Sequence, residues 1–315
     1  MIDPARPIPV PAEDEVLVHV DLAGICSTDL AMLSGYKGNF LGVLGHEFVG
    51  TVVAAAGHDE WLGQRVVAEI NVVCGQCDRC RQGLAKHCRN RRAVGISNYD
   101  GVFAEYMVAP VKNLHPIPAS MTDRTAVFVE PLAAALRITE QVALSPETVV
   151  YQLGDGRLGM LIAQVMMHTG CRLTVIGRSD EKAQLLAQLG VDHAVRLGSP
   201  ACDVLFDHEA DVVIEVTGSP DGFALASRLV RPQGTLMLKS TYAGFLPNFD
   251  ASRLVVDEIT VIGGRCGPFV PAIDLLNRGV VQVEPLITDV FPLAQGVEAL
   301  SRAAEHGVLK VMIKP

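Results

Sequence analysis

Apolar and polar positions follow one pattern in the first third of the chain and another pattern after it. Polar and apolar residues alternate over 15–20, as in a half-buried strand, and 48–53 and 65–68 are further strand candidates. After about residue 125, short apolar segments alternate with helical stretches. The predicted strands are 149–153, 172–176, 211–216 and 235–238, and the predicted helices are 158–168 and 181–189. This alternation predicts βαβ units around a parallel sheet.

These patterns divide the chain into a β-rich part, which ends near residue 118, and an α/β part. Shorter elements return at the C-terminal end, where 309–313 is strand-like. The length of 315 residues suggests about two domains, each large enough for its own core. The predicted fold class is therefore α/β, with a β-rich domain and a doubly wound parallel sheet.

Composition and charge exclude several classes of protein. The chain has 49% hydrophobic and 19% charged residues, which excludes intrinsic disorder. Its net charge of −9 argues against a nucleic-acid partner, because such proteins carry a basic surface. The most apolar uncharged stretch, 158–171, is shorter than the ~18 residues of a membrane span. The N-terminus shows no apolar signal-peptide segment, so we expect a cytoplasmic protein without a membrane partner.

Half of the eight cysteines crowd into one short segment. Cys74, Cys77, Cys80 and Cys88 follow the spacing C-x2-C-x2-C-x7-C. In a cytoplasmic chain this spacing predicts a structural Zn²⁺ site, closed by four thiolates. An iron–sulfur cluster is one alternative, although the bacterial ferredoxin spacing before the last cysteine is shorter and is followed by proline. Two disulfides are the other alternative, which a reducing compartment disfavours.

Two further motifs contain single metal-ligand residues. Cys26 lies in Gly24–Asp29, and His46 and Glu47 lie in Gly45–Gly50. Taken alone, Cys26 fits a small buried residue and His46 fits a core histidine. Together with the four-cysteine segment downstream, however, the motifs resemble the zinc-containing medium-chain dehydrogenase/reductase family.

The resemblance implies a catalytic zinc ion, bound by Cys26 and His46. Its third ligand is expected to be Glu130, because the Glu-Pro-Leu-Ala segment is similar to the polyol, glucose and threonine dehydrogenase branch. Glu47 is an alternate ligand, and a helix-start carboxylate is the plain alternative for Glu130. Thr28 matches the hydroxyl that relays the alcohol proton, but Ala31 stands where many members continue the relay with histidine.

A glycine-rich turn predicts a dinucleotide site. Gly154, Gly156 and Gly159 form G-x-G-x-x-G between a predicted strand and a predicted helix, which is the context that this motif requires. The pyrophosphate of the cofactor is expected at the start of that helix, near Leu158. An ordinary strand–helix turn is the alternative.

The next strand ends in Gly177, Arg178 and Ser179, and this end is expected to select the cofactor. An NAD site usually has Asp or Glu at the place of Gly177. We predict that no carboxylate at this position repels the 2′-phosphate of NADP(H). Arg178 is expected to pair with that phosphate, and Ser179 to add a hydroxyl, so the sequence favours NADP(H). NAD(H) stays an alternative, because Asp180 and Glu181 follow. Further cofactor contacts are expected at the ends of later strands, from Thr217, Lys239 and Ser240.

The resemblance extends over almost the whole chain, from about residue 7 to residue 315. It implies a GroES-like catalytic domain of residues 1–131 and 287–315, and a Rossmann domain of residues 132–286. It also implies a homodimer or homotetramer. Members usually begin with a β-hairpin that this sequence lacks, so we expect either a start site further upstream or a trimmed domain.

The predicted function is that of a zinc-dependent oxidoreductase acting on a small-molecule alcohol or polyol, or on its carbonyl product. Hydride is exchanged with a nicotinamide cofactor, and NADP(H) is favoured. One alternative is a zinc-independent enone or quinone reductase of the same superfamily. The other is a nucleotide-binding protein without catalysis, which Ala31 permits.

Overall fold

The computed structural model describes residues 2–36, 38, 40–205, 210–241 and 250–315. The chain forms two compact units. The first comprises Met1–Glu130, Phe269–Gly279 and Val283–Pro315, and the second comprises Pro131–Pro268 and Val280–Gln282. The predicted domain limits differ from this division mainly at the second boundary, because Phe269–Gly279 folds with the first unit.

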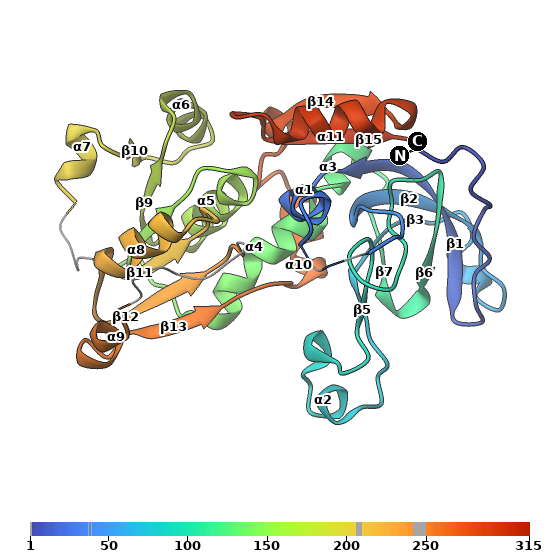
Figure 1. Ribbon diagram of the computed structural model, residues 1–315, viewed down its shortest axis with the longest axis horizontal. Helices are drawn as coiled ribbons and strands as arrows, with labels where there is room; N and C mark the ends of the chain where they lie inside the picture. The colour runs from blue at the N-terminus through green and yellow to red at the C-terminus, as the bar shows by residue number, and fades with distance from the viewer. Residues whose placement is uncertain (1, 37, 39, 206–209, 242–249) are drawn as a thin grey trace. The chain divides into compact units, whose positions relative to one another are not determined.

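The first unit is built on a seven-stranded sheet of order β14-β15-β1-β2-β3-β7, in which β6 also pairs with β1. Its strands are β1 (Glu15–Gly24), β2 (Glu47–Ala54), β3 (Arg65–Ala68), β6 (Tyr106–Pro110), β7 (Leu114–Pro116), β14 (Ile287–Pro292) and β15 (Lys310–Lys314). Every second side chain of β1 is buried over most of its length, which confirms the predicted half-buried strand. The last strand, β15, pairs antiparallel with β1, so both ends of the chain contribute to one sheet (Figure 1).

Short elements surround this sheet. They are α1 (Ser27–Leu33), η1 (Asp59–Trp61), β4 (Asn71–Val72), α2 (Asp78–Arg81), η2 (Ala85–His87), β5 (Arg92–Ala93), η3 (Val111–Asn113), α3 (Asp123–Ala126), α10 (Phe269–Asn277), η4 (Glu284–Leu286), η5 (Leu293–Gln295) and α11 (Gly296–Ala304). One core is formed largely by side chains of these strands and includes Val16, Val18, Val66 and Met107. A loop carrying α2 stands off from the sheet (Figure 1).

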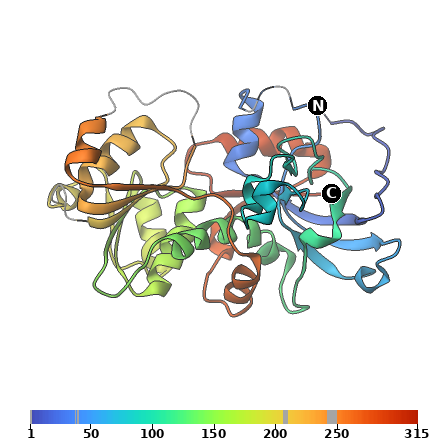
Figure 2. The same ribbon diagram turned by 90° about the horizontal axis from the view of Figure 1, so that it is seen from below.

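The second unit contains a six-stranded sheet of order β10-β9-β8-β11-β12-β13, and all its strand pairs are parallel. Its strands are β8 (Val149–Leu153), β9 (Arg172–Gly177), β10 (Ala194–Arg196), β11 (Ala210–Glu215), β12 (Val230–Leu238) and β13 (Thr260–Gly263). Its helices are α5 (Arg157–Thr169), α6 (Asp180–Gln188), α7 (Pro200–Asp203), α8 (Pro220–Leu229) and α9 (Ala251–Val256), and α4 (Val129–Gln141) leads into it. Helices lie on both faces of the sheet (Figure 2), which confirms the predicted doubly wound fold.

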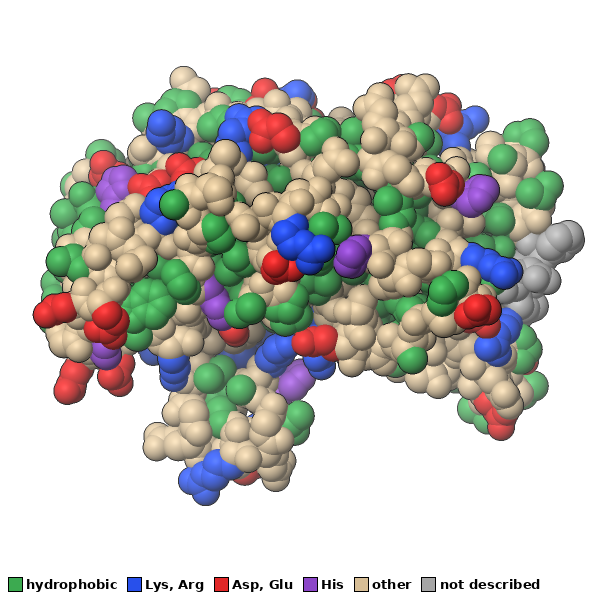
Figure 3. All heavy atoms as spheres, turned by 180° about the vertical axis from the view of Figure 1, so that it is seen from behind, with side chains coloured by type: hydrophobic (Ala, Val, Ile, Leu, Met, Phe, Trp, Pro, Cys, Tyr) green, Lys and Arg blue, Asp and Glu red, His purple; other side chains and the backbone are tan. Residues whose placement is uncertain are grey.

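The surface and the helices add two observations. Acidic and basic side chains are interspersed over the face drawn in Figure 3, so the excess of negative charge is not gathered in one place there. No helix of the described part of the chain combines the length and the apolar character that crossing a membrane requires.

Candidate functional site

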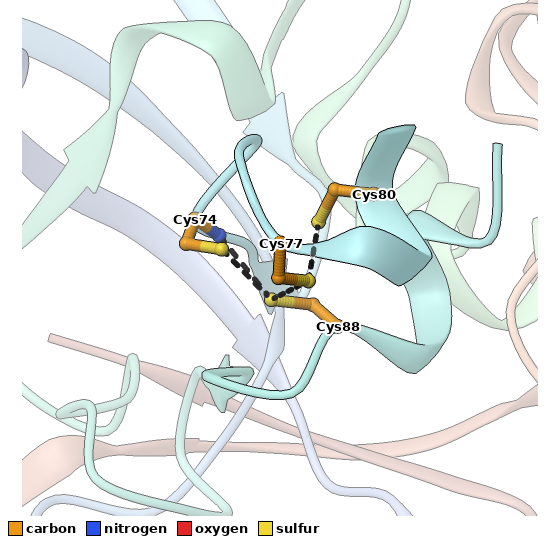
Figure 4. A group of neighbouring side chains, drawn as sticks. All are labelled: Cys74, Cys77, Cys80 and Cys88. Atoms are coloured by element: carbon orange, nitrogen blue, oxygen red, sulfur yellow. Dashed lines mark hydrogen bonds between the residues drawn. The ribbon is translucent and has the colours of Figure 1, made fainter. Parts of the chain in front are cut away.

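The four predicted cysteines converge on one point of the α2 loop (Figure 4). The Sγ atoms of Cys77 and Cys80 are 3.5 Å apart, those of Cys88 and Cys74 are also 3.5 Å apart, and those of Cys77 and Cys88 are 3.8 Å apart. Sulfur atoms around a tetrahedral zinc ion lie roughly 3.8 Å apart when the Zn–S bonds are about 2.3 Å. A disulfide would need about 2.05 Å. The donor set therefore fits a tetrahedral metal ion, and none of the four cysteines is in a disulfide.

The electrostatics of this loop favour a thiolate at Cys77 and a protonated thiol at Cys80 when no metal ion is bound. Backbone N–H groups of Arg89 and Cys80 lower the pKa of Cys77 to about 6. Partial burial and the neighbouring sulfurs of Cys77 and Cys88 raise the pKa of Cys80 to about 12. Adjacent thiolates repel one another, so the loop cannot carry four negative charges unless a cation compensates them.

A second group of metal-ligand residues lies at the end of β1 and the start of β2. Ligand atoms of Cys26, His46 and Glu47 lie within 4.8 Å of one another. Strand pairing explains this proximity, because Gly24 of β1 pairs with Glu47 of β2. His46 and Glu47 are buried, with 3% and 1% of their surface exposed, whereas Cys26 is partly exposed. A polar group buried to this degree requires a partner, and a thiol, an imidazole and a carboxylate together suit Zn²⁺.

Asp29 supports this group from behind and was not predicted as a site residue. It is fully buried and forms a capping box with Cys26, which is the N-cap of α1 three residues earlier. Its Oδ2 accepts a hydrogen bond of 2.8 Å from the Cys26 N–H, and its Oδ1 accepts one of 3.2 Å from the Gly45 N–H. The C-x-x-D spacing is the signal that could have revealed it.

The same carboxylate faces His46. Asp29 Oδ1 lies 3.5 Å from His46 Nδ1, which is buried and has no hydrogen bond of its own in the described part of the chain. Burial lowers the pKa of His46, but Asp29 and Cys26 outweigh this effect and raise it well above its ordinary value. A carboxylate behind one ring nitrogen is the usual arrangement when the other nitrogen binds a metal ion.

Lys310 of β15 is a second residue that sequence reasoning missed. Its Nζ forms a buried ion pair with Glu47 Oε2, and both side chains are almost fully excluded from solvent. The same ammonium lies 5.4 Å from the centre of the Phe128 ring. One oxygen of Glu47 is thereby committed to Lys310. No local signal announces this pair, because 263 residues separate its members.

The other predicted residues of this site are placed as follows. Glu130 lies in the first turn of α4 and is partly buried. It is not a member of the group formed by Cys26, His46 and Glu47. Ligation by Glu130 therefore stays a prediction. Thr28 lies in the first turn of α1, where its backbone N–H donates to Cys26 Sγ over 3.5 Å.

The glycine-rich turn has the geometry that its motif requires. Gly154 has a φ of +118°, which disfavours any residue with a side chain. A Cβ at Gly159 would lie 2.4 Å from the carbonyl oxygen of Gly154, so the helix could not pack here. Gln152, another residue that was not predicted, donates hydrogen bonds of 2.9 Å to the carbonyl oxygens of Gly154 and Gly159. Gly156 precedes α5 as its N-cap, and Leu158 lies in its first turn.

The end of β9 differs from the expectation in one respect. Asp155, inside the glycine motif, reaches this point, and its Oδ2 accepts a hydrogen bond of 3.0 Å from the Arg178 N–H. The prediction that no carboxylate stands beside Gly177 was therefore wrong, because the acid comes from the preceding turn. The Arg178 side chain is exposed. Ser179 is the N-cap of α6, and its hydroxyl accepts a hydrogen bond from the Lys182 N–H and donates one to Glu181.

A buried carboxylate organises the ends of β11 and β12. Glu215 Oε1 accepts from the Thr217 N–H at 2.7 Å and from the Thr217 hydroxyl at 2.5 Å, and its Oε2 accepts from the Ser240 hydroxyl at 2.6 Å. Lys239 Nζ donates to three backbone carbonyls, those of Ala134, Gly264 and Arg265. These polar groups thus hold the loops at the carboxyl end of the sheet, where ligands of such folds bind.

Comparison with known proteins identifies the family. A family profile described as "Alcohol dehydrogenase GroES-like domain" matches residues 12–119, and one described as "Zinc-binding dehydrogenase" matches residues 158–278. An L-threonine 3-dehydrogenase of Xanthomonas campestris pv. campestris (strain B100) is 34% identical over 231 residues, which cover 69% of this chain and 67% of that protein. A sorbitol dehydrogenase of Halalkalibacterium halodurans is 28% identical over 98% of this chain and 94% of its own length.

Solved structures of similar fold support the same family. A protein of Sinorhizobium meliloti 1021 described as a zinc-binding dehydrogenase and bound to NADP has a TM-score of 0.89 and 32% identity, with 98% of this chain and 94% of that chain covered. A dehydrogenase of Escherichia coli CFT073 (rspB), complexed with NADH, also has a TM-score of 0.89, with 27% identity over 98% of this chain and 94% of that chain. The chain belongs to the zinc-containing medium-chain dehydrogenase/reductase family.

Proposed function

We propose that this oxidoreductase is a zinc-dependent alcohol or polyol dehydrogenase that exchanges hydride with NADP(H) in preference to NAD(H). The observation that carries the proposal is the group of Cys26 with the buried His46 and Glu47, in a chain that also has the dinucleotide turn. The relatives named as sorbitol, D-arabitol-phosphate and D-arabinitol dehydrogenases support a polyol substrate.

Cys26 and His46 would hold the catalytic zinc ion together with one carboxylate, from Glu47 or from Glu130. Bound zinc acts as a Lewis acid that lowers the pKa of an alcohol at its open position. Asp29 would keep His46 in the orientation and tautomer that ligation requires, since it lies 3.5 Å from Nδ1. The Thr28 hydroxyl would accept the alcohol proton and at the same time donate its own proton onward. Because Ala31 cannot relay the proton further, we expect water to carry it to solvent.

The four cysteines of the α2 loop would hold a second, structural zinc ion. The Sγ distances of 3.5 to 3.8 Å and the lowered pKa of Cys77 support this assignment. The site has four protein ligands and so no open position for substrate, which makes it structural. Its expected role is to stabilise a loop that stands off from the sheet.

The residues at the end of β9 support the preference for NADP(H). Gly177 carries no side chain at the place of the usual acid, and the exposed Arg178 guanidinium next to it suits a 2′-phosphate. Related structures bound to NADP and to NADH are both known, so the preference depends on these local residues. A homodimer or homotetramer in the cytoplasm completes the proposal, and light scattering would test the assembly.

Metal analysis and turnover, measured on the same preparations, test this function. We expect two zinc ions per chain and oxidation of at least one member of a panel of alcohols and polyols. Cys26→Ser should leave one zinc ion and abolish turnover, whereas the matched variant Cys202→Ser should keep both ions and full turnover. One zinc ion in the wild type, with NADPH-dependent reduction of enones, would instead indicate the zinc-independent reductase. Cofactor binding without turnover on any substrate would indicate a protein that has lost catalysis.

A further inference from the structure

A carboxylate of the glycine motif fills the space beside Gly177. Asp155 is 8% exposed, and its Oδ2 accepts the Arg178 N–H at 3.0 Å. A Cβ built on Gly177 would lie 2.2 Å from that Oδ2, which is closer than the non-bonded contacts that real Cβ atoms make. The Asp155 carboxylate thus stands where the side chain of residue 177 would begin.

In dinucleotide-binding sheets, the residue at the position of Gly177 usually contacts the adenosine ribose of the cofactor. The acid that distinguishes NAD(H) follows the fingerprint by about 20 residues and accepts hydrogen bonds from the ribose hydroxyls. The corresponding position here is Gly177. Asp155 comes instead from the turn itself, next to the start of α5, where the helix dipole stabilises a negative charge. The local acid is therefore present although its usual position is glycine.

Two opposite charges then act on one part of the cofactor. The exposed Arg178 guanidinium attracts a 2′-phosphate, and the Asp155 carboxylate repels it. We propose that Asp155 is a specificity-determining residue, which accepts hydrogen bonds from the adenosine ribose of NAD(H) and limits the preference for NADP(H). This inference rests on the proposed dinucleotide site.

The purely structural alternative is that Asp155 only accepts the Arg178 N–H. The variant Asp155→Asn separates the two roles, because its amide oxygen still accepts that hydrogen bond while the charge is lost. The matched control is Asp192→Asn, which removes the same charge from an exposed position in the same unit.

Dissociation constants of NADH and NADPH, from fluorescence titrations at one ionic strength, test the proposal. We expect Asp155→Asn to shift the ratio of the two constants in favour of NADPH by about tenfold or more, and Asp192→Asn to leave it unchanged. If both cofactors bind to Asp155→Asn and the ratio stays within about twofold of that of the wild type, the proposed role of Asp155 is overturned, while the dinucleotide site stands. A wild type that binds neither cofactor would overturn the dinucleotide site itself.

A double variant tests whether the position of the acid matters. Gly177→Asp alone should weaken the binding of both cofactors, because the new Cβ would lie 2.2 Å from Asp155 Oδ2 and force the end of β9 to shift. In Asp155→Ala combined with Gly177→Asp the acid returns to its usual place, and NADH binding should recover relative to Asp155→Ala.

One measurement needs no variant. The wild type should bind 5′-AMP about tenfold more tightly than 2′-deoxy-5′-AMP, because the latter lacks a hydroxyl that donates to a charged acceptor. Equal affinities would contradict the proposed contact.

Discussion

Removal of the Lys310 charge is the most direct test of how the fold supports the candidate active site. The ion pair with Glu47 is buried on both sides, with side-chain exposures of 3% for Lys310 and 2% for Glu47. In Lys310→Met the long apolar stem is kept, but the carboxylate loses its cationic partner. Lys310 Nζ also lies 3.5 Å from the carbonyl oxygen of Ile25, so the variant gives up that contact as well.

The expected magnitude follows from this burial. Removing one member of a buried ion pair costs about 3–5 kcal/mol, because the other charge is left without compensation. Replacing both members by neutral groups costs far less, since no charge then remains buried. We therefore expect Lys310→Met to lower the free energy of unfolding by about 3 kcal/mol or more, and Glu47→Gln combined with Lys310→Met to recover a large part of that loss.

Urea unfolding of zinc-stripped protein, followed by fluorescence, is the appropriate assay, because bound zinc would add its own stabilisation. Lys314→Met is the matched control, since Lys314 is exposed on the same strand and its replacement should change little. A loss below about 1 kcal/mol in Lys310→Met, or a double variant less stable than the single one, would refute the argument that this pair is a coupled buried unit.

Three further predictions concern the metal sites and a carboxylate of the second unit. Cys77→Ser should lose one zinc ion per chain and expose the α2 loop to proteases, which metal analysis and limited proteolysis would detect. Asp29→Asn should weaken catalytic zinc binding about 10- to 100-fold, because His46 loses its orienting carboxylate; a chelator titration measures this loss, and unchanged affinity would contradict it. Partial burial raises the pKa of Asp211, but hydrogen bonds and the charge of Arg231 outweigh it and lower the pKa below its ordinary value. The stabilisation from Asp211 is therefore present above about pH 4 and is lost as the pH falls further, so Asp211→Asn should destabilise more at pH 7 than at pH 3 in urea unfolding.

Local sequence patterns were sufficient to predict much of the fold and the residue types of the two metal-ligand groups. The alternation in β1 and the strand–turn–helix around Gly154 depend on neighbours in the sequence, because backbone periodicity and turn geometry act over a few residues. The four cysteines occupy a single short loop, so their convergence follows from spacing alone. The family resemblance extended this interpretation to Cys26 and His46.

Tertiary structure decided which charges meet. Lys310 reaches Glu47 only because β15 pairs with β1, and Asp155 reaches Gly177 only because β8 and β9 are neighbours in the sheet. Such contacts depend on strand order and register, which bring together residues that no local periodicity relates. The sequence by itself therefore determined which residue types gather in the two metal-ligand groups and in the glycine turn. The arrangement of the strands decided which buried carboxylate acquired a partner and which acid stands beside Gly177.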